Sequence, residues 1–312
     1  VLPGFVESHS HPILLGRYLE EVDCRYCSSL EEIVQVLRER ASNTPPGWWV
    51  VGNGYDHTLL KESRHPNRRE LDRASDEHPI LLRNITVHNV VANSRALELA
   101  GVTAKTPDPE GGRIGRDAKG EPDGVLWEWA QDLVQSHLPE PSVEDVRRQL
   151  ENAAKEYLSA GVTSVVDAAL GLANGMRDAE AYARVAGDGG LAVRLGAAIV
   201  YPLWKELQGG AGPGLEWPGD PVWVRPLAVK FFQDGSIQIH TAALRQPYYG
   251  ETEPADAHHL IWPQEELDRM VVDAHSSGWQ IWTHGNGDAA IGSILDAYEK
   301  ALTSDPRGDH RH

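Results

Sequence analysis

Residues 142–168 read SVEDVRRQLENAAKEYLSAGVTSVVDA, and this stretch decides the fold class. Ser142 suits the N-cap of a helix, because its hydroxyl can accept a hydrogen bond from a free amide of the first turn. Gly161 suits the other end, where glycine tolerates the left-handed conformation. The apolar run TSVVDA at 163–168 then predicts a buried strand. The stretch is therefore one helix followed by one strand.

The same alternation continues toward the end of the sequence. It predicts helices at 176–186, 263–277 and 288–302, and strands at 193–200, 225–232 and 279–284. A buried first strand is predicted at 2–9 and a helix at 28–40. Mostly apolar strands that alternate with helices are typical of parallel β/α units. Such units close into a barrel or form a doubly wound sheet, and the absence of a G-x-G-x-x-G motif after a strand disfavours the dinucleotide-binding form of the sheet.

The region between residues 43 and 141 is richer in turn-forming residues than the rest of the sequence described above. Turn-forming runs such as PPG and GEPDG separate short strand candidates at 48–51 and 80–83 and a helix candidate at 94–100. We therefore expect three parts: a first barrel strand and helix at 1–40, an insertion subdomain at 41–141, and further β/α units at 142–312.

The composition limits the classes of partner. The 312 residues are 41% hydrophobic, as in a globular protein, and carry a net charge of −17. This charge disfavours nucleic-acid binding, which needs clustered Lys and Arg, and no apolar run approaches the ~18 residues of a membrane span. The only cysteines, Cys24 and Cys27, are expected to be reduced thiols of a cytoplasmic protein. We expect a small-molecule substrate, and the sequence leaves a homo-oligomer open.

Polar residues fall at the ends of three predicted strands. His9 and His11 end the first strand, and residues two apart on a strand point to the same face. Lys230 lies in the strand RPLAVKFF, and His284 ends the strand WQIWTH. Catalytic residues of a β/α barrel lie at the carboxyl ends of its strands. Because imidazole is a common metal ligand, this arrangement predicts a metal site.

Lys230 allows two interpretations from the residues alone. A charged lysine inside an apolar strand is costly unless it is paired, and an ion pair with Asp167 or Asp234 would supply that partner. A buried lysine also becomes neutral more easily, and a neutral amine can react with carbon dioxide to form a carbamate, which ligates metal as a carboxylate does. Asp234 and Asp288 are expected to order the loops after their strands.

Four motifs together resemble the amidohydrolase superfamily of metal-dependent hydrolases. They are PGFVESHSH at 3–11, GVTSVVDA at 161–168, VKFFQDGS at 229–236 and THGNGDAA at 283–290. The nearest branch is amidohydrolase family 3, which includes N-substituted formamide deformylase, and the middle region resembles that branch too. The resemblance implies a distorted TIM barrel beside a small β-sandwich, incomplete here with about five β/α units and a large insertion after the first strand.

The resemblance also implies the site. The metal ligands would be His9, His11, His284 and a carboxylated Lys230, around one or two divalent ions, most plausibly zinc, with a bridging hydroxide as the nucleophile. A further His and the general-base Asp are expected beyond residue 312, so the chain is expected to be truncated at both ends. His240 stands where the family often has Arg.

The expected function is hydrolysis of a C–N bond in an amide, formamide or N-acyl substrate. Tyr55, Asp56 and His88 are the candidate substrate-binding residues of the insertion. Two alternatives remain: a deaminase of the same fold, and a truncated homologue that binds metal without catalysis.

Overall fold

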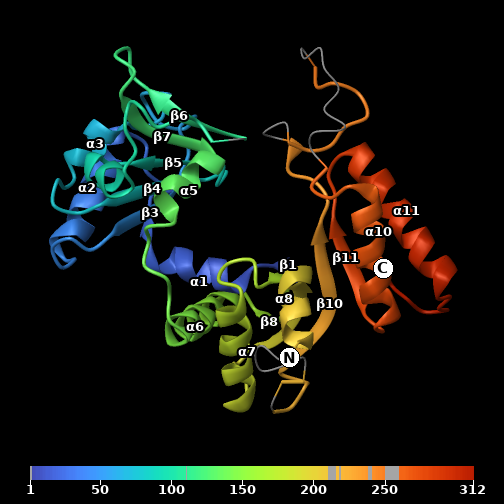
Figure 1. Cartoon of the computed structure of the whole chain (residues 1–312). Coiled ribbons are helices and arrows are strands. Elements are labelled where there is room, and N and C mark those ends of the chain that lie inside the picture. The colour runs from blue at the N-terminus through green and yellow to red at the C-terminus, as the bar shows by residue number, and fades with distance from the viewer. Residues whose placement is uncertain (1, 110, 210–215, 218, 238–240, 250–259) are drawn as a thin grey trace. The chain divides into compact units, whose positions relative to one another are not determined.

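The computed structural model describes residues 2–109, 111–209, 216–217, 219–237, 241–249 and 260–312 (Figure 1). The chain divides into two compact units. The first combines Val1–Gly16 with Pro141–His312, and the second is Arg17–Glu140. His240 lies outside the described residues.

The first unit contains a curled, fully parallel sheet that forms half of a barrel (Figure 1). Its strand order is β1 (Phe5–Ser10), β8 (Val162–Leu170), β9 (Arg194–Val200), β10 (Val224–Phe232) and β11 (Gln280–His284). The prediction of parallel β/α units is confirmed. The first strand begins later than the predicted residue 2, because pairing with β8 starts at Phe5. The prediction that this strand is buried was wrong, since Phe5 is 69% and Val6 66% exposed.

The helices of this unit among the described residues are α1 (Pro12–Glu20), which continues into the second unit, α6 (Val143–Ser159), α7 (Met176–Gly187), α8 (Tyr201–Gln208), α10 (Gln264–Ser276) and α11 (Asp288–Ser304). Ser142 caps α6 as predicted: its hydroxyl accepts a hydrogen bond from the amide of Asp145, whose carboxylate accepts from the amide of Ser142. Val146, Leu150 and Ala153 form the buried stripe of α6. Gly161 follows with a φ of +77°, which explains why glycine ends the turn.

The second unit is built on a six-stranded mixed sheet. Its order is β2 (Val22–Asp23), β3 (Val50–Tyr55), β4 (Ile80–Asn84), β5 (Asn89–Ala92), β7 (Pro122–Glu128) and β6 (Gly112–Arg116). The first two pairings are parallel and the others antiparallel. The helical segments are α2 (Leu30–Ser42), α3 (Arg68–Asp72), α4 (Ser94–Leu99), η1 (Trp129–Gln131) and α5 (Asp132–Gln135).

The helix α2 packs its apolar side against this second sheet, with Ile33, Val34 and Leu37 fully buried. The predicted strands at 48–51 and 80–83 and the predicted helix at 94–100 correspond to β3, β4 and α4. The β6–β7 hairpin was not predicted, because its sequence contains glycines and a proline, which are typical of turns. The domain boundaries at residues 40 and 141 stay predictions.

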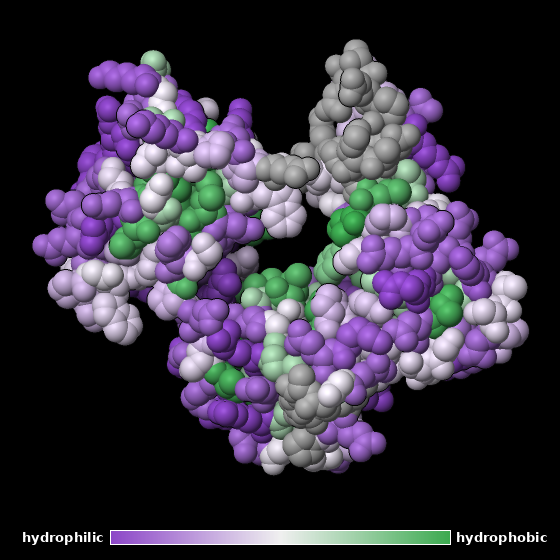
Figure 2. All heavy atoms as spheres, viewed as in Figure 1, coloured by the Kyte–Doolittle hydropathy of each residue, from purple (hydrophilic) through white to green (hydrophobic). Residues whose placement is uncertain are grey.

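Polar and charged residues cover most of the viewed face of each unit, and hydrophobic residues of the first unit gather over the carboxyl ends of its strands (Figure 2). Among the described residues, no helix has the length and apolar character that crossing a membrane requires.

Candidate metal centre

The sheet of the first unit brings Lys230 and His284 to one face. Lys230 pairs with Trp282 across β10 and β11, and Phe232 pairs with His284. Since residues two apart share a face of a strand, Lys230, Phe232 and His284 point to the same side. The Lys230 Nζ lies 5.0 Å from the ring centroid of Phe232, and that ring lies 5.6 Å from the ring of His284.

His9 lies among the other predicted ligands. Its ring centroid is 5.9 Å from that of His11, and the two rings are nearly perpendicular. Burial lowers the pKa of His9, and three neighbouring basic groups lower it further: Lys230, His11 and His284. His9 ends β1 and His284 ends β11, His11 directly follows β1, and Lys230 lies two residues before the end of β10.

Lys230 is 5% exposed, and burial lowers the pKa of its ammonium group. Among the described residues it forms no ion pair with Asp167 or Asp234, which were its alternative partners. A buried amine without an anionic partner is more easily deprotonated, as carbamate formation requires.

Two buried aspartates support this region. Asp167 faces His11, with 3.8 Å between Oδ1 and Nδ1, and its Oδ2 accepts a hydrogen bond from the hydroxyl of Tyr182 at 2.9 Å. The sequence did not indicate the contact with His11, because pairing between β1 and β8 creates it.

Asp234 accepts hydrogen bonds from the backbone amides of Ala243, Asn286 and Gly287. It thereby joins the loops that follow β10 and β11. Asp288 accepts from the amide of Arg245. The predicted loop-ordering role of both aspartates is confirmed.

The candidate ligand residues fit a metal ion through the chemistry of their donor atoms. Imidazoles and a lysine that can carry a carbamate suit zinc or a similar ion. As the described side chains lie, no three His, Cys, Asp or Glu residues form a group that could hold a metal ion. His284 accounts for part of this, because its Nε2 lies 3.0 Å from the carbonyl oxygen of Gly235 and 3.1 Å from the Asn286 amide nitrogen. In this position Nε2 is engaged by the residues after β10 and β11 and is not free to ligate a metal.

A hollow of about 400 Å³ opens beside Lys230 in the same unit. Apart from Lys230 and Glu206, its lining is apolar or neutral, with Leu172, Tyr201, Leu203, Phe231, Phe232, Ile261 and Trp262 among the lining residues. This hollow can receive an apolar part of a small molecule next to the candidate metal centre.

Tyr55, one of the candidate substrate-binding residues, belongs to the second unit and is fully buried. Its hydroxyl accepts a hydrogen bond from the Asn89 amide at 2.9 Å and lies 2.9 Å from His65 Nδ1. Burial raises the pKa of this phenol and lowers the pKa of His65 to about 4. His65 is therefore a neutral imidazole near pH 7.

Asp56 and His88 also belong to the second unit. Asp56 Oδ1 accepts hydrogen bonds from the amide and hydroxyl of Thr58, which is a turn-forming role and lowers the pKa of the carboxyl. His88 Nδ1 lies 3.2 Å from Glu128 Oε2. Substrate binding by Tyr55, Asp56 and His88 stays a prediction.

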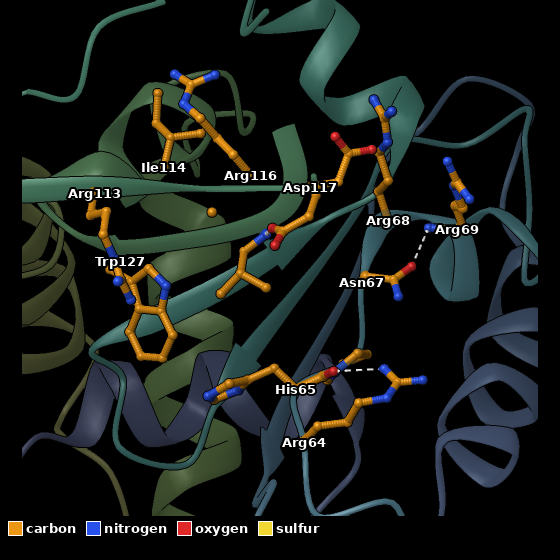
Figure 3. A pocket seen from close by; sticks show the side chains of 14 residues that line it. Arg64, His65, Asn67, Arg68, Arg69, Arg113, Ile114, Arg116, Asp117 and Trp127 are labelled. Carbon is orange, nitrogen blue, oxygen red and sulfur yellow. Dashed lines mark hydrogen bonds between the residues drawn. The ribbon is translucent and has the colours of Figure 1, made fainter. Parts of the chain in front are cut away.

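An arginine-rich hollow of about 700 Å³, which no sequence motif predicted, lies in the second unit (Figure 3). Arg64, Arg68, Arg69, Arg113 and Arg116 line it with His65 and Trp127. The guanidinium of Arg113 lies 5.2 Å from the Trp127 ring centroid, while Arg64 pairs with Glu70. Several of these residues lie in loops or in the unpredicted β6–β7 hairpin, so no periodic pattern could mark them.

The profile of the amidohydrolase family matches residues 1–312. The chain is 31% identical to the putative amidohydrolase YtcJ of Bacillus subtilis, over 99% of this chain and 57% of that protein. It is 30% identical to N-substituted formamide deformylase of Arthrobacter pascens, over 96% of this chain and 55% of that protein.

A solved structure is similar as well. The structure of a metal-dependent hydrolase from Pyrococcus horikoshii matches 95% of this chain and 56% of its own, with a TM-score of 0.73 and 27% sequence identity. The chain thus spans a little over half the length of these relatives.

Proposed function

This chain belongs to the amidohydrolase family, and we propose that the protein hydrolyses a C–N bond of a small amide, formamide or N-acyl substrate with a bound divalent metal ion. The family and the metal-dependent structural neighbour support a hydrolase that needs metal. The observation that supports the proposal most is the position of four residues near the carboxyl ends of parallel strands: His9 and His11 at the end of β1, the buried Lys230 in β10 and His284 at the end of β11.

The proposal assigns roles to this chain's own residues. His9, His11 and His284 would hold the ion, for which we propose zinc, and Lys230 would complete the ligand set. A bound ion of this kind supplies Lewis acidity for the carbonyl and lowers the pKa of a water to near 7. Asp167 would orient His11 through its Nδ1 side. The general base is not assigned to a residue of this chain.

Lys230 is proposed to act as a carbamate. Its neutral amine would form an N–C bond with carbon dioxide and release one proton to solvent, which leaves a carboxylate-type ligand. Burial of the amine supports this step. Carbon-13 NMR of protein kept in labelled bicarbonate tests it: a carbamate signal is expected in the wild type and not in Lys230→Arg. An unmodified lysine beside one ion would favour the deaminase alternative.

We also propose that the curled sheet is the first part of a distorted TIM barrel interrupted by Arg17–Glu140. The likeness to 56% of the hydrolase from P. horikoshii supports this. The apolar hollow beside Lys230 supports a substrate with an apolar group on its acyl or amine side.

Elemental analysis tests the metal site directly. We expect one or two divalent ions per wild-type chain and their loss in the His9→Ala/His11→Ala double variant. His137→Ala, an exposed histidine of the second unit, is the matched control and should keep the metal. Equal metal content in all three proteins, or none in the wild type, would contradict the proposal. Amides and formamides with apolar substituents are then the first substrates to assay on the whole protein.

A further inference from the structure

A small polar cavity lies inside the second unit, apart from the arginine-rich hollow of Figure 3. Its volume is about 170 Å³, and it is lined by Arg17, Tyr18, Arg83, Val87, Gln131 and Gln135. The residues come from α1, β4, the turn after β4, and the η1–α5 segment. None of them belongs to the candidate metal centre.

Arg83 is the central feature of this cavity, because its side chain is only 6% exposed. Its Nη1 donates to Gln135 Oε1, and its Nε lies 3.5 Å from Glu21 Oε1. Within the part of the chain that the structure describes, its Nη2 is buried and has no hydrogen-bond partner, and the same is true of Glu21 Oε2. A buried charged donor without a partner is costly, so this nitrogen indicates a missing acceptor.

The charges around the cavity do not balance. Arg17 and Arg83 share one carboxylate, with Glu21 Oε1 lying 3.4 Å from Arg17 Nε and 3.5 Å from Arg83 Nε. Two guanidinium groups and one carboxylate leave one excess positive charge. Burial lowers the pKa of Arg83, and the charge of Arg17 lowers it further, as expected for uncompensated cations. A ligand with a single negative charge would restore neutrality.

The backbone beside the cavity is strained. Val87, which lines it, has a φ of +58°, a conformation that β-branched residues rarely adopt. Such strain is retained where the surrounding structure holds it for function.

We propose that this cavity binds a small monocarboxylate. The planar guanidinium fork of Arg83 matches the two oxygens of a carboxylate, and Arg17 would supply the balancing charge. The amide groups of Gln131 and Gln135 offer further donors. A phosphate, which carries more than one negative charge near pH 7, would exceed the single excess charge. This site goes beyond the proposed hydrolase function and does not depend on it.

Thermal unfolding of the metal-free chain tests the proposal, with sodium acetate as the probe and sodium chloride at equal ionic strength as the reference. A ligand that binds only the folded state raises the melting temperature as its concentration rises. We expect an acetate-specific rise in the wild type. In Arg17→Met, which leaves Arg83 and Glu21 as a neutral pair, the apparent acetate affinity should fall at least tenfold. The exposed Arg69→Met, in the hollow of Figure 3, removes the same charge and should keep the wild-type response.

Two results would overturn the proposal. One is the absence of an acetate-specific rise in the wild type. The other is a rise that is lost in Arg69→Met and kept in Arg17→Met, which would assign the binding to the other hollow. Arg17 is 29% exposed, so the fold should tolerate its replacement. If Arg17→Met does not fold, Arg17→Lys serves instead: it keeps the charge without the planar fork, and an unchanged acetate affinity would then contradict the geometry.

Discussion

His11 and Asp167 face each other across the paired strands β1 and β8, with 3.8 Å between the imidazole Nδ1 and the carboxylate Oδ1. The carboxylate is 3% exposed and is held by the hydroxyl of Tyr182. A carboxylate on the Nδ1 side favours the tautomer that leaves Nε2 free to ligate a metal.

Asp167→Asn is therefore expected to weaken metal binding without abolishing it. Loss of a carboxylate behind a ligating histidine typically costs about 10- to 100-fold in affinity. Zinc titration against a competing chromophoric chelator measures the change. Asp178→Asn is the matched control, because Asp178 is also buried but accepts its hydrogen bonds from Asn174. An equal effect of both variants would mean that general electrostatics, not orientation of His11, is responsible.

Lys230→Met separates a functional lysine from a structural one. Lys230 is buried without an ion pair among the described residues, so an apolar side chain of similar length should leave the free energy of unfolding of the metal-free chain unchanged or raise it by about 1 kcal/mol. Metal content should fall in the same variant. Urea unfolding and elemental analysis provide the two measurements. A loss of more than about 2 kcal/mol would show that the amine supports the fold.

Ser142→Ala tests the cap of α6. The hydroxyl of Ser142 accepts from the amide of Asp145 at 3.1 Å, and its loss should lower the free energy of unfolding by about 1 kcal/mol. Urea unfolding measures this difference. Ser159→Ala, at the other end of the same helix, should stay within about 0.5 kcal/mol of the wild type. The cap would be unimportant if the two variants were equally stable.

The sequence predicted the first unit better than the second for a physical reason. The strands and helices after residue 141 have strong apolar periodicity, which local sequence expresses. The sheet of the second unit includes short strands such as GRIGR in β6, where glycine is required by close packing: a Cβ on Gly112 would lie 2.3 Å from the amide nitrogen of Ala130. Such glycines have the local signature of a turn.

The two candidate sites also differ in how far local sequence could predict them. The strand ends that carry His9, His11, Lys230 and His284 follow from strand positions, so sequence could predict them. The burial of Arg83 depends on Glu21, 62 residues earlier, and on Gln135, 52 residues later. No local pattern encodes such contacts, and an arginine at the end of ILLRN has the sequence signature of an exposed strand end.

The pH dependence of the free energy of unfolding should show the raised pKa of the Asp178 carboxyl. Burial raises the pKa of this carboxyl from 3.8 to about 6. Between these two values the folded chain holds a proton that the unfolded chain has released, so the free energy of unfolding should fall as pH rises through this window. The contribution is fully present below pH 3.8 and lost above about pH 6. A shift of about two units corresponds to at most about 3 kcal/mol.

Asp178→Asn removes this titration while keeping the size of the side chain. The difference in unfolding free energy between wild type and variant should therefore change by about 2–3 kcal/mol between pH 4 and pH 7, in the direction that makes the variant relatively more stable at pH 7. Urea unfolding at unit steps of pH measures that difference, and comparing the two proteins cancels the titration of all other groups. A difference that does not vary with pH would mean that Asp178 ionises normally in the folded chain, with Asn174 solvating its charge through the two hydrogen bonds it donates.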